Sequence, residues 1–161
     1  MEFFKIYEEA LGKDDLYIMI AFEPEEQLFD SSFLQRVDSF VRICRNLNFV
    51  ERVYSITNLN QIIKSPLGFS SIPFIHLDNP ARFKSDSIRI RNNLLLTQNF
   101  VSSEITSVVV LMRIEEKQTG MRLDSAFSEL DGIIREAGIP KVHLMGRKYL
   151  EYQYQELVSR N

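Results

Sequence analysis

The fold is decided by the stretch Ser31–Asn58, which reads SSFLQRVDSFVRICRNLNFVERVYSITN. Apolar residues recur every three or four positions from Phe33 to Leu47, and this spacing predicts an amphipathic helix with one buried stripe. The hydroxyl of Ser31 or Ser32 is expected to cap its first turn. From Val50 to Thr57 the residues become β-branched and aromatic, which predicts a strand. The stretch therefore forms half of a β-α-β unit.

The first strand of this unit is expected just upstream, over Asp15–Phe22 (DLYIMIAF). This apolar run is short and has charged residues and a proline on its flanks, so a buried strand fits it better than a helix. Before it, Met1–Leu11 carries apolar residues at helical spacing, and Gly12 supplies the expected helix stop.

A second β-α-β unit is expected after residue 88. Leu94–Ser102 and Ile105–Ile114 are interpreted as two strands of a hairpin, the second of them central because it is apolar on both faces. A second apolar stripe, from Leu123 to Ala137, predicts a helix that Gly138 and Pro140 terminate. Lys141–Met145 then predicts a short strand, and Tyr149–Val158 a final helix after Gly146.

Residues 58–87 lack a sustained period and contain Pro66, Gly68, Pro73 and Pro80. We expect an irregular insertion with one short helical turn near Leu59–Lys64. Its apolar residues are a candidate substrate or partner surface, while packing of most of them on the sheet is the simpler reading. They are Phe69, Ile72, Phe74 and Ile75.

The order of elements predicts an α+β fold of the ferredoxin-like split β-α-β type, made of two β-α-β halves with a long irregular insertion. Both helices are expected on one face of the sheet. The other face is then left free to meet something else.

Composition limits the functional classes. The 161 residues are 45% hydrophobic and 25% charged, as in a globular domain, and the net charge of -3 argues against nucleic-acid binding. A single cysteine excludes an intrachain disulfide. No run of eighteen apolar residues and no signal peptide is present in the sequence.

No catalytic constellation appears in the sequence. His76 and His143 have no companion ligand at metal-binding spacing, and Cys44 lies on the apolar helix face, where a small core residue is expected. Asp14-Asp15 fits a solvated strand entry better than a cation site. We therefore expect no enzyme activity, no cofactor and no metal.

Residues 15–58 and the preceding helix resemble the first large extracytoplasmic loop of resistance–nodulation–division (RND) transporters of the MMPL and Patched-like branch. The resemblance rests on Phe4 to Gly12, Asp14-Asp15, Leu28-Phe29, and the pattern Val50, Val53, Ser55, Thr57, Asn58. NLLLTQNFVSSEITSVVVLMRI resembles the family's hairpin, with Ser103-Glu104 where the family often has Asp-Gly. Ala137–Pro140 resembles the exit from its second helix.

The resemblance implies a single porter-type domain on the periplasmic or extracellular side of a membrane exporter. In that reading residues 1–12 follow the first membrane helix, 15–57 form the first half, and 58–87 the insertion. Residues 88–146 form the hairpin and second half, and 147–161 lead to the second membrane helix. The implied partners are the second porter domain of the same transporter, the membrane through flanking helices, a hydrophobic or lipid-like substrate, and further copies of the chain.

Two alternatives remain at this point. A stand-alone cytosolic ferredoxin-like regulatory module, which binds a small ligand and dimerises through its sheet, has the same element order. An RNA-binding domain of this topology is disfavoured, because the chain is acidic and no strand carries the aromatic and basic residues that such domains use.

Overall fold

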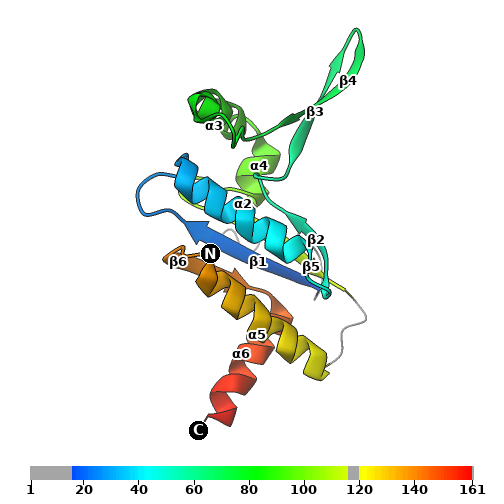
Figure 1. Ribbon diagram of the computed structural model, residues 1–161, viewed down its shortest axis with the longest axis vertical. Helices are drawn as coiled ribbons and strands as arrows, with labels where there is room; N and C mark the ends of the chain where they lie inside the picture. The colour runs from blue at the N-terminus through cyan, green and yellow to red at the C-terminus, as the bar shows by residue number, and fades with distance from the viewer. Residues whose placement is uncertain (1–15, 116–119, 161) are drawn as a thin grey trace.

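The computed structural model describes residues 16–115 and 120–160. The described chain folds into two sheets and a set of helices, drawn in Figure 1. In chain order the elements are β1 (Tyr17–Glu23), α2 (Ser31–Arg45), β2 (Val50–Tyr54), β3 (Asn60–Ser65), β4 (Gly68–Pro73), the 3-10 turn η1 (Pro80–Arg82), α3 (Phe83–Arg91), α4 (Leu94–Asn99), β5 (Val108–Ile114), α5 (Gly120–Glu136), β6 (Lys141–Met145) and α6 (Arg147–Ser159).

The main sheet has four strands in the order β2-β5-β1-β6, and every neighbouring pair is antiparallel. The register places Ile20 opposite Val110 on one side of β1 and opposite Leu144 on the other. This order, with a helix after β1 and another after β5, is the ferredoxin-like arrangement of two split β-α-β units. The α+β fold class expected from the sequence is therefore confirmed.

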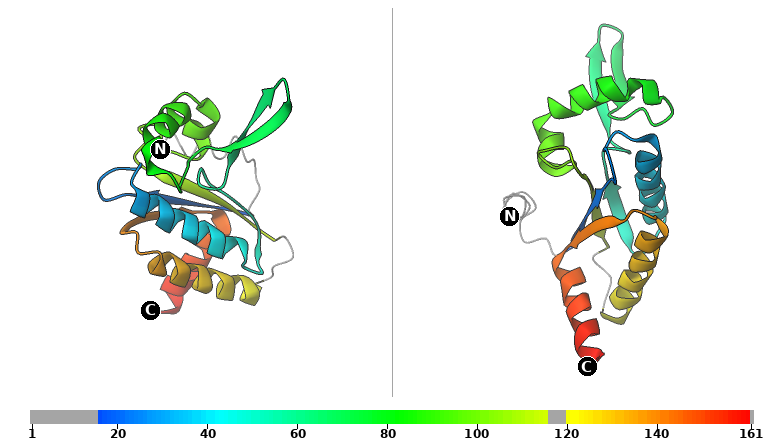
Figure 2. Two further views of the ribbon diagram at one scale, coloured as in Figure 1. Left: turned by 45° about the horizontal axis from the view of Figure 1, so that its top comes forward. Right: turned by 90° about the vertical axis from the view of Figure 1, so that its left-hand side faces the viewer.

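Helices α2 and α5 lie side by side on one face of this sheet, as the edge-on view in Figure 2 shows. Successive side chains of a strand point to opposite faces of the sheet, so every second residue of β1 and β5 packs against the apolar stripes of these helices. Phe22 of β1 and Phe40 of α2 pack edge to face with ring centroids 4.9 Å apart. The largest fully buried side chains include Phe22, Phe40, Phe127, Ile20, Leu34, Met112 and Leu130.

The N-terminal cap of α2 differs from the expectation. Asp30, and not Ser31 or Ser32, is the capping residue: its backbone is extended and its Oδ2 accepts a hydrogen bond from Phe33 N at 2.8 Å. The two serines lie one and two positions inside the helix, where their hydroxyls accept from side chains of the next turn. A carboxylate at the cap also interacts favourably with the helix dipole.

The segment Leu94–Ser102 is a second correction, because it is not a strand. Leu94–Asn99 forms helix α4, which Asn93 caps by accepting a hydrogen bond from Leu96 N. Only Leu96 of its three leucines is buried. The expected hairpin is reduced to an isolated bridge between Val101 and Val108. The second strand of that prediction, β5, is confirmed and is central.

The insertion is more regular than expected. The predicted helical turn near Leu59–Lys64 is wrong, since Asn60–Ser65 is a strand paired with Gly68–Pro73. Helices α3 and α4 follow it, so the segment between β2 and β5 holds a hairpin and two helices. Phe83, Ile90 and Leu96 anchor these helices in the core.

The later elements agree with the sequence analysis. Strand β6 covers Lys141–Met145, α5 ends before Gly138, whose φ of 66° is left-handed, and α6 follows Gly146. The predicted helix over Met1–Leu11 and the pair Asp14-Asp15 lie outside the described residues. Among the helices that the structure describes, none combines the length and the hydropathy needed to cross a membrane.

Candidate interaction surface

The hairpin of β3 and β4, called here the hairpin arm (residues 60–73), projects from the body of the molecule (Figure 1). Its turn is Ser65-Pro66-Leu67-Gly68, and serine, proline and glycine occupy the positions that they favour in a type I turn. Gly68 has a φ of 123°, which other residues rarely adopt, and Ser65 Oγ donates a hydrogen bond to Gly68 O at 3.1 Å. The residues of the turn therefore stabilise the hairpin without contacts from the rest of the domain.

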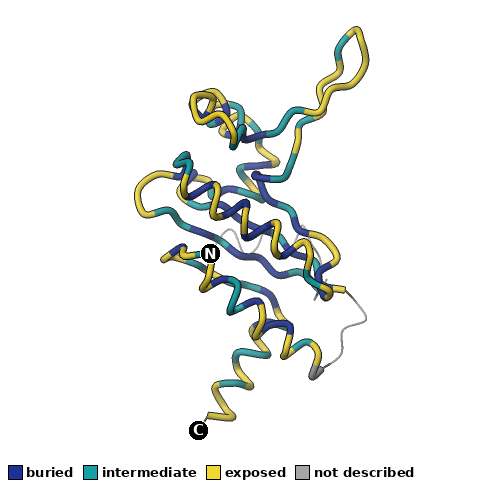
Figure 3. The backbone as a smooth tube through the Cα atoms, viewed as in Figure 1, coloured by how far each residue is buried: buried dark blue, intermediate teal, exposed yellow. Residues whose placement is uncertain are grey.

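Most of the arm is exposed to solvent, as the burial colouring in Figure 3 shows. Leu67 at the tip is 100% exposed, Phe69 is 76% exposed and Ile62 is 72% exposed. Phe69 lies opposite Lys64, and Ile62 lies opposite Ser71, so Phe69 and Ile62 belong to the same face of the arm. Large apolar groups this exposed on a protruding element are typical of an interaction site.

The four residues that the sequence singled out do not form one surface. Phe69 is exposed on the arm and Ile72 is half-buried near its base. Phe74 is 8% exposed and Ile75 is 2% exposed, and both belong to the core. Of the four residues, only Phe69 is therefore available as a surface residue; Ile72 is half-buried, and Phe74 and Ile75 belong to the core.

A buried ionic cluster holds the base of the arm. The Asp86 carboxylate, which is fully buried on α3, accepts hydrogen bonds from His76 N at 2.9 Å and from Arg89 Nη2 at 2.8 Å. Its Oδ1 also lies 2.9 Å from His76 Nδ1. Arg89 Nη2 further donates to the carbonyl oxygens of Pro73 and Phe74, where β4 ends. The cluster therefore fixes the exit of the arm against α3.

Helix α6 presents a second exposed apolar stripe at the opposite end of the molecule (Figure 1). The stripe consists of Leu150, Tyr154, Leu157 and Val158, each between 56% and 70% exposed. These residues follow helical spacing, so they share one side of α6.

The opposite side of α6 is fastened to α5. Tyr149 OH donates to Asp131 Oδ1 at 2.6 Å, and Gln153 Nε2 donates to Asp131 Oδ2 at 3.2 Å. Burial, and then the hydrogen bond to Asp131, raise the pKa of the Tyr149 phenol well above its usual range. The Tyr149 ring also packs edge to face on Phe127. Only the outward side of α6 is therefore left for a partner.

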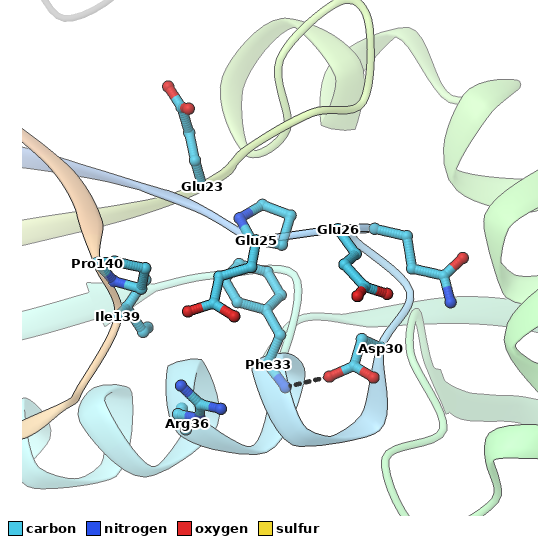
Figure 4. Close-up of a pocket in the computed structure, with 10 residues that line it drawn as sticks. Glu23, Glu25, Glu26, Asp30, Phe33, Arg36, Ile139 and Pro140 are labelled. Atoms are coloured by element: carbon cyan, nitrogen blue, oxygen red, sulfur yellow. Dashed lines mark hydrogen bonds between the residues drawn. The ribbon is translucent and has the colours of Figure 1, made fainter.

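A small pocket of about 240 Å³ lies between the β1–α2 loop and the end of α5 (Figure 4). Glu25, Glu26 and Asp30 line it together with Arg36. Asp30 is occupied by the helix cap, and Arg36 Nη1 donates to Gly138 O at 2.9 Å. Asp30 and Arg36 thus have structural partners, and the pocket volume is below the range of about 300–1,000 Å³ usual for small-molecule sites.

The isolated functional groups have structural roles as well. His143 Nε2 lies 2.9 Å from Glu23 Oε1 on the exposed sheet edge, and His76 faces Asp86. Cys44 is fully buried, and burial raises its pKa from 9.0 to about 12, so its thiol is not a nucleophile at neutral pH. Over residues 16–115 and 120–160 no group of three or more metal-ligating side chains occurs.

Neither the hairpin arm nor its ionic base was expected from the sequence. The signal for the arm was the turn sequence Ser65-Pro66-Leu67-Gly68 between two short runs with isoleucine and phenylalanine. Asp86 and Arg89 lie at i, i+3 spacing on one helix, but His76 joins them only when the insertion folds, so no local signal pointed to the whole cluster.

No protein-family model matches the chain, and no curated protein sequence matches it.

Proposed function

We propose that this chain is the extracytoplasmic porter-type domain of an RND-type membrane exporter. In this role it contributes to the binding and passage of a hydrophobic or lipid-like substrate and docks on the second porter domain of the same transporter. Support comes from the ordered sequence resemblance and from the ferredoxin-like order of the strands, with the insertion between the two β-α-β halves.

The observation that carries the proposal is the position at which the chain enters and leaves the main sheet. The start of β1 and the end of β6 are neighbours: Met19 pairs with Met145, and a Cβ atom on Gly146 would lie 2.9 Å from Tyr17 O. A domain placed between two adjacent membrane helices needs its entry and exit on the same side. This arrangement supports such an insertion.

The side chains support a role in binding and not in chemistry. Among the described residues, no hydrogen bond joins either histidine to a hydroxyl or thiol, and the one cysteine is buried. Of the twelve exposed large apolar side chains among the described residues, four lie on the hairpin arm and four on α6, and the rest are on α2, α3 and α4. In such transporters the energy for export comes from ion movement through charged residues within membrane helices, so a domain of this kind supplies contacts for substrate and partner.

A cytosolic regulatory module remains the competing function, and membrane sidedness separates the two. The exposed Ser103, in the loop before β5, is replaced by cysteine in the protein encoded by the full reading frame. We expect a membrane-impermeant maleimide to label this variant in intact spheroplasts. The wild-type protein is the control, since its domain cysteine Cys44 is buried. Labelling of the variant only after lysis would place the domain in the cytosol and refute the proposal.

A further inference from the structure

We propose that the hairpin arm is a self-association element, in which the free edge of β4 pairs antiparallel with β4 of a second copy about a twofold axis through Ser70. The inference goes beyond the exporter function and does not depend on it. It rests on the backbone of the arm, its distribution of charge and its exposed apolar face.

The outer edge of β4 carries unpaired hydrogen-bonding groups. Strand β4 pairs only with β3 among the described strands. Ser65 and Gly68 flank the two-residue turn and form the hydrogen-bonded pair that closes it. Because such pairs alternate along an antiparallel ladder, the N–H and C=O groups of Phe69 and Ser71 point outward. These two residues therefore offer donors and acceptors to another strand.

The edge of β4 lacks the features that normally prevent strand addition. Native edge strands are protected by charged residues, especially lysine, or by proline. Strand β3 has Lys64 one residue from its end, whereas β4 has no charged residue, and the only proline of β4 is the terminal Pro73. Gly68, Phe69, Ser70 and Ser71 are all exposed. The unprotected edge is thus the one on β4.

Charge favours a partner that is itself nearly neutral. No aspartate or glutamate occurs between Glu51 and Asp78, and Lys64 is the only charged residue of the arm. A strongly acidic or strongly basic peptide would meet only the single charge of Lys64 on the arm, so charge gives it little affinity. A second arm meets no repulsion, since pairing through β4 keeps the two Lys64 residues three strand spacings apart, about 14 Å and beyond the screening length of about 8–10 Å.

One register pairs the outward main-chain groups of both copies and also places their apolar faces on the same side of the sheet. With the axis at Ser70, Phe69 lies opposite Ser71 of the second copy, and about four main-chain hydrogen bonds form. Ile62 and Phe69 of both copies then lie on one face of a four-stranded sheet. The pairing satisfies the outward main-chain groups of β4, joins the apolar faces of the two arms into one larger face, and leaves each domain body intact. Because this interface is small, we expect a dimer that depends on protein concentration.

Cysteine cross-linking of residues 1–161 tests the register. The variants Ser70→Cys and Ile63→Cys place the thiol on the same rung of the arm, since Ile63 pairs with Ser70. Across the twofold axis the two Ser70 Cα atoms are about 4.5 Å apart, within disulfide reach, whereas the two Ile63 Cα atoms are about 14 Å apart. We expect Ser70→Cys to form a covalent dimer at least ten times faster than Ile63→Cys under mild oxidation.

A second variant removes the pairing without opening the arm. Ser71→Pro deletes an outward N–H and leaves the bonds between β3 and β4 in place, so the dimer seen by sedimentation equilibrium should weaken by tenfold or more. Faster cross-linking of Ile63→Cys, equal rates for both variants, or a monomer at all concentrations would overturn the proposal. Binding to anionic vesicles that requires Leu67 and Phe69, without cross-linking at Ser70, would assign the arm to a membrane and also overturn it.

Discussion

Oδ1 of Asp86 lies 2.9 Å from Nδ1 of His76, and the same carboxylate accepts from Arg89 Nη2. His76 follows the arm by a few residues, while Asp86 and Arg89 belong to α3. The contact therefore joins a loop that carries no regular structure to a helix that is anchored in the core. The contact therefore holds the end of the largely exposed hairpin arm in a fixed orientation relative to α3.

Removal of the Asp86 carboxylate should destabilise the domain strongly. In Asp86→Ala the guanidinium of Arg89 and the N–H of His76 lose their buried acceptor, which costs about 3–5 kcal/mol of unfolding free energy. Urea unfolding followed by circular dichroism measures the loss. Asp78→Asn, at an exposed carboxylate in the same insertion, is the control and should stay within about 0.5 kcal/mol of wild type. Equal losses in both variants would refute the structural role of the cluster.

Replacement by alanine should have opposite effects on stability at Gly146 and at Gly132. A Cβ atom at Gly146 would meet Tyr17 O at 2.9 Å and Ile18 Cα at 3.3 Å, so Gly146→Ala forces β1 and β6 apart and should cost about 1–3 kcal/mol. Gly132, inside α5, has open space around its Cβ position. Gly132→Ala should therefore add about 0.5–1 kcal/mol through helix propensity. Thermal unfolding of the two variants decides the sign of each change.

The ferredoxin-like core could be predicted because each of its elements buries one face. In α2 and α5 the buried stripe imposes helical periodicity, and in β5 burial on both faces gives a continuous apolar run from Val108 to Met112. The sequence pattern and the tertiary packing agree for these elements. Strand β6 was predicted with its observed bounds, because Pro140 and Gly146 limit it on both sides.

The hairpin arm and α4 could not be predicted from periodicity. The arm buries neither face, so β3 and β4 carry no alternation of apolar and polar residues. In α4, Leu94 and Leu95 are exposed and only Leu96 enters the core, so the run of three leucines resembles a buried strand. The residue that decides for a helix is Asn93, whose side chain caps it.

The choice of helix cap gives a direct test at α2. Asp30→Ala should cost about 1 kcal/mol, because Phe33 N loses the carboxylate acceptor at 2.8 Å. Ser31→Ala and Ser32→Ala should each change stability by less than about 0.5 kcal/mol, since their hydroxyls accept only from exposed side chains. Denaturant midpoints of the three variants compare them. If either serine variant lost more stability than Asp30→Ala, that serine and not Asp30 would be the capping residue.

Burial of Cys44 predicts a loss of stability at alkaline pH. Its pKa rises from 9.0 to about 12 on folding because burial disfavours the thiolate. Between these values the unfolded thiol ionises while the folded thiol keeps its proton, so the unfolding free energy falls as pH rises above about 9. The difference in urea midpoint between wild type and Cys44→Ala should narrow over this range. A thiol reagent at pH 8 should modify Cys44 only in denaturant, and rapid modification of the folded domain would contradict this burial.

The Tyr149 phenol makes the shorter of two hydrogen bonds from α6 to Asp131 of α5, and its removal should loosen the helix. In Tyr149→Phe the ring still packs on Phe127, but Asp131 loses a hydrogen bond of 2.6 Å, which costs about 1.5–3 kcal/mol for a charged acceptor. We expect amide hydrogen exchange in α6 to accelerate more than in α2, because the bond acts locally. Tyr154→Phe, at a side chain that is 70% exposed, is the control and should leave exchange unchanged. Equal acceleration in α2 and α6 would mean that Tyr149 stabilises the whole domain and not the position of its last helix.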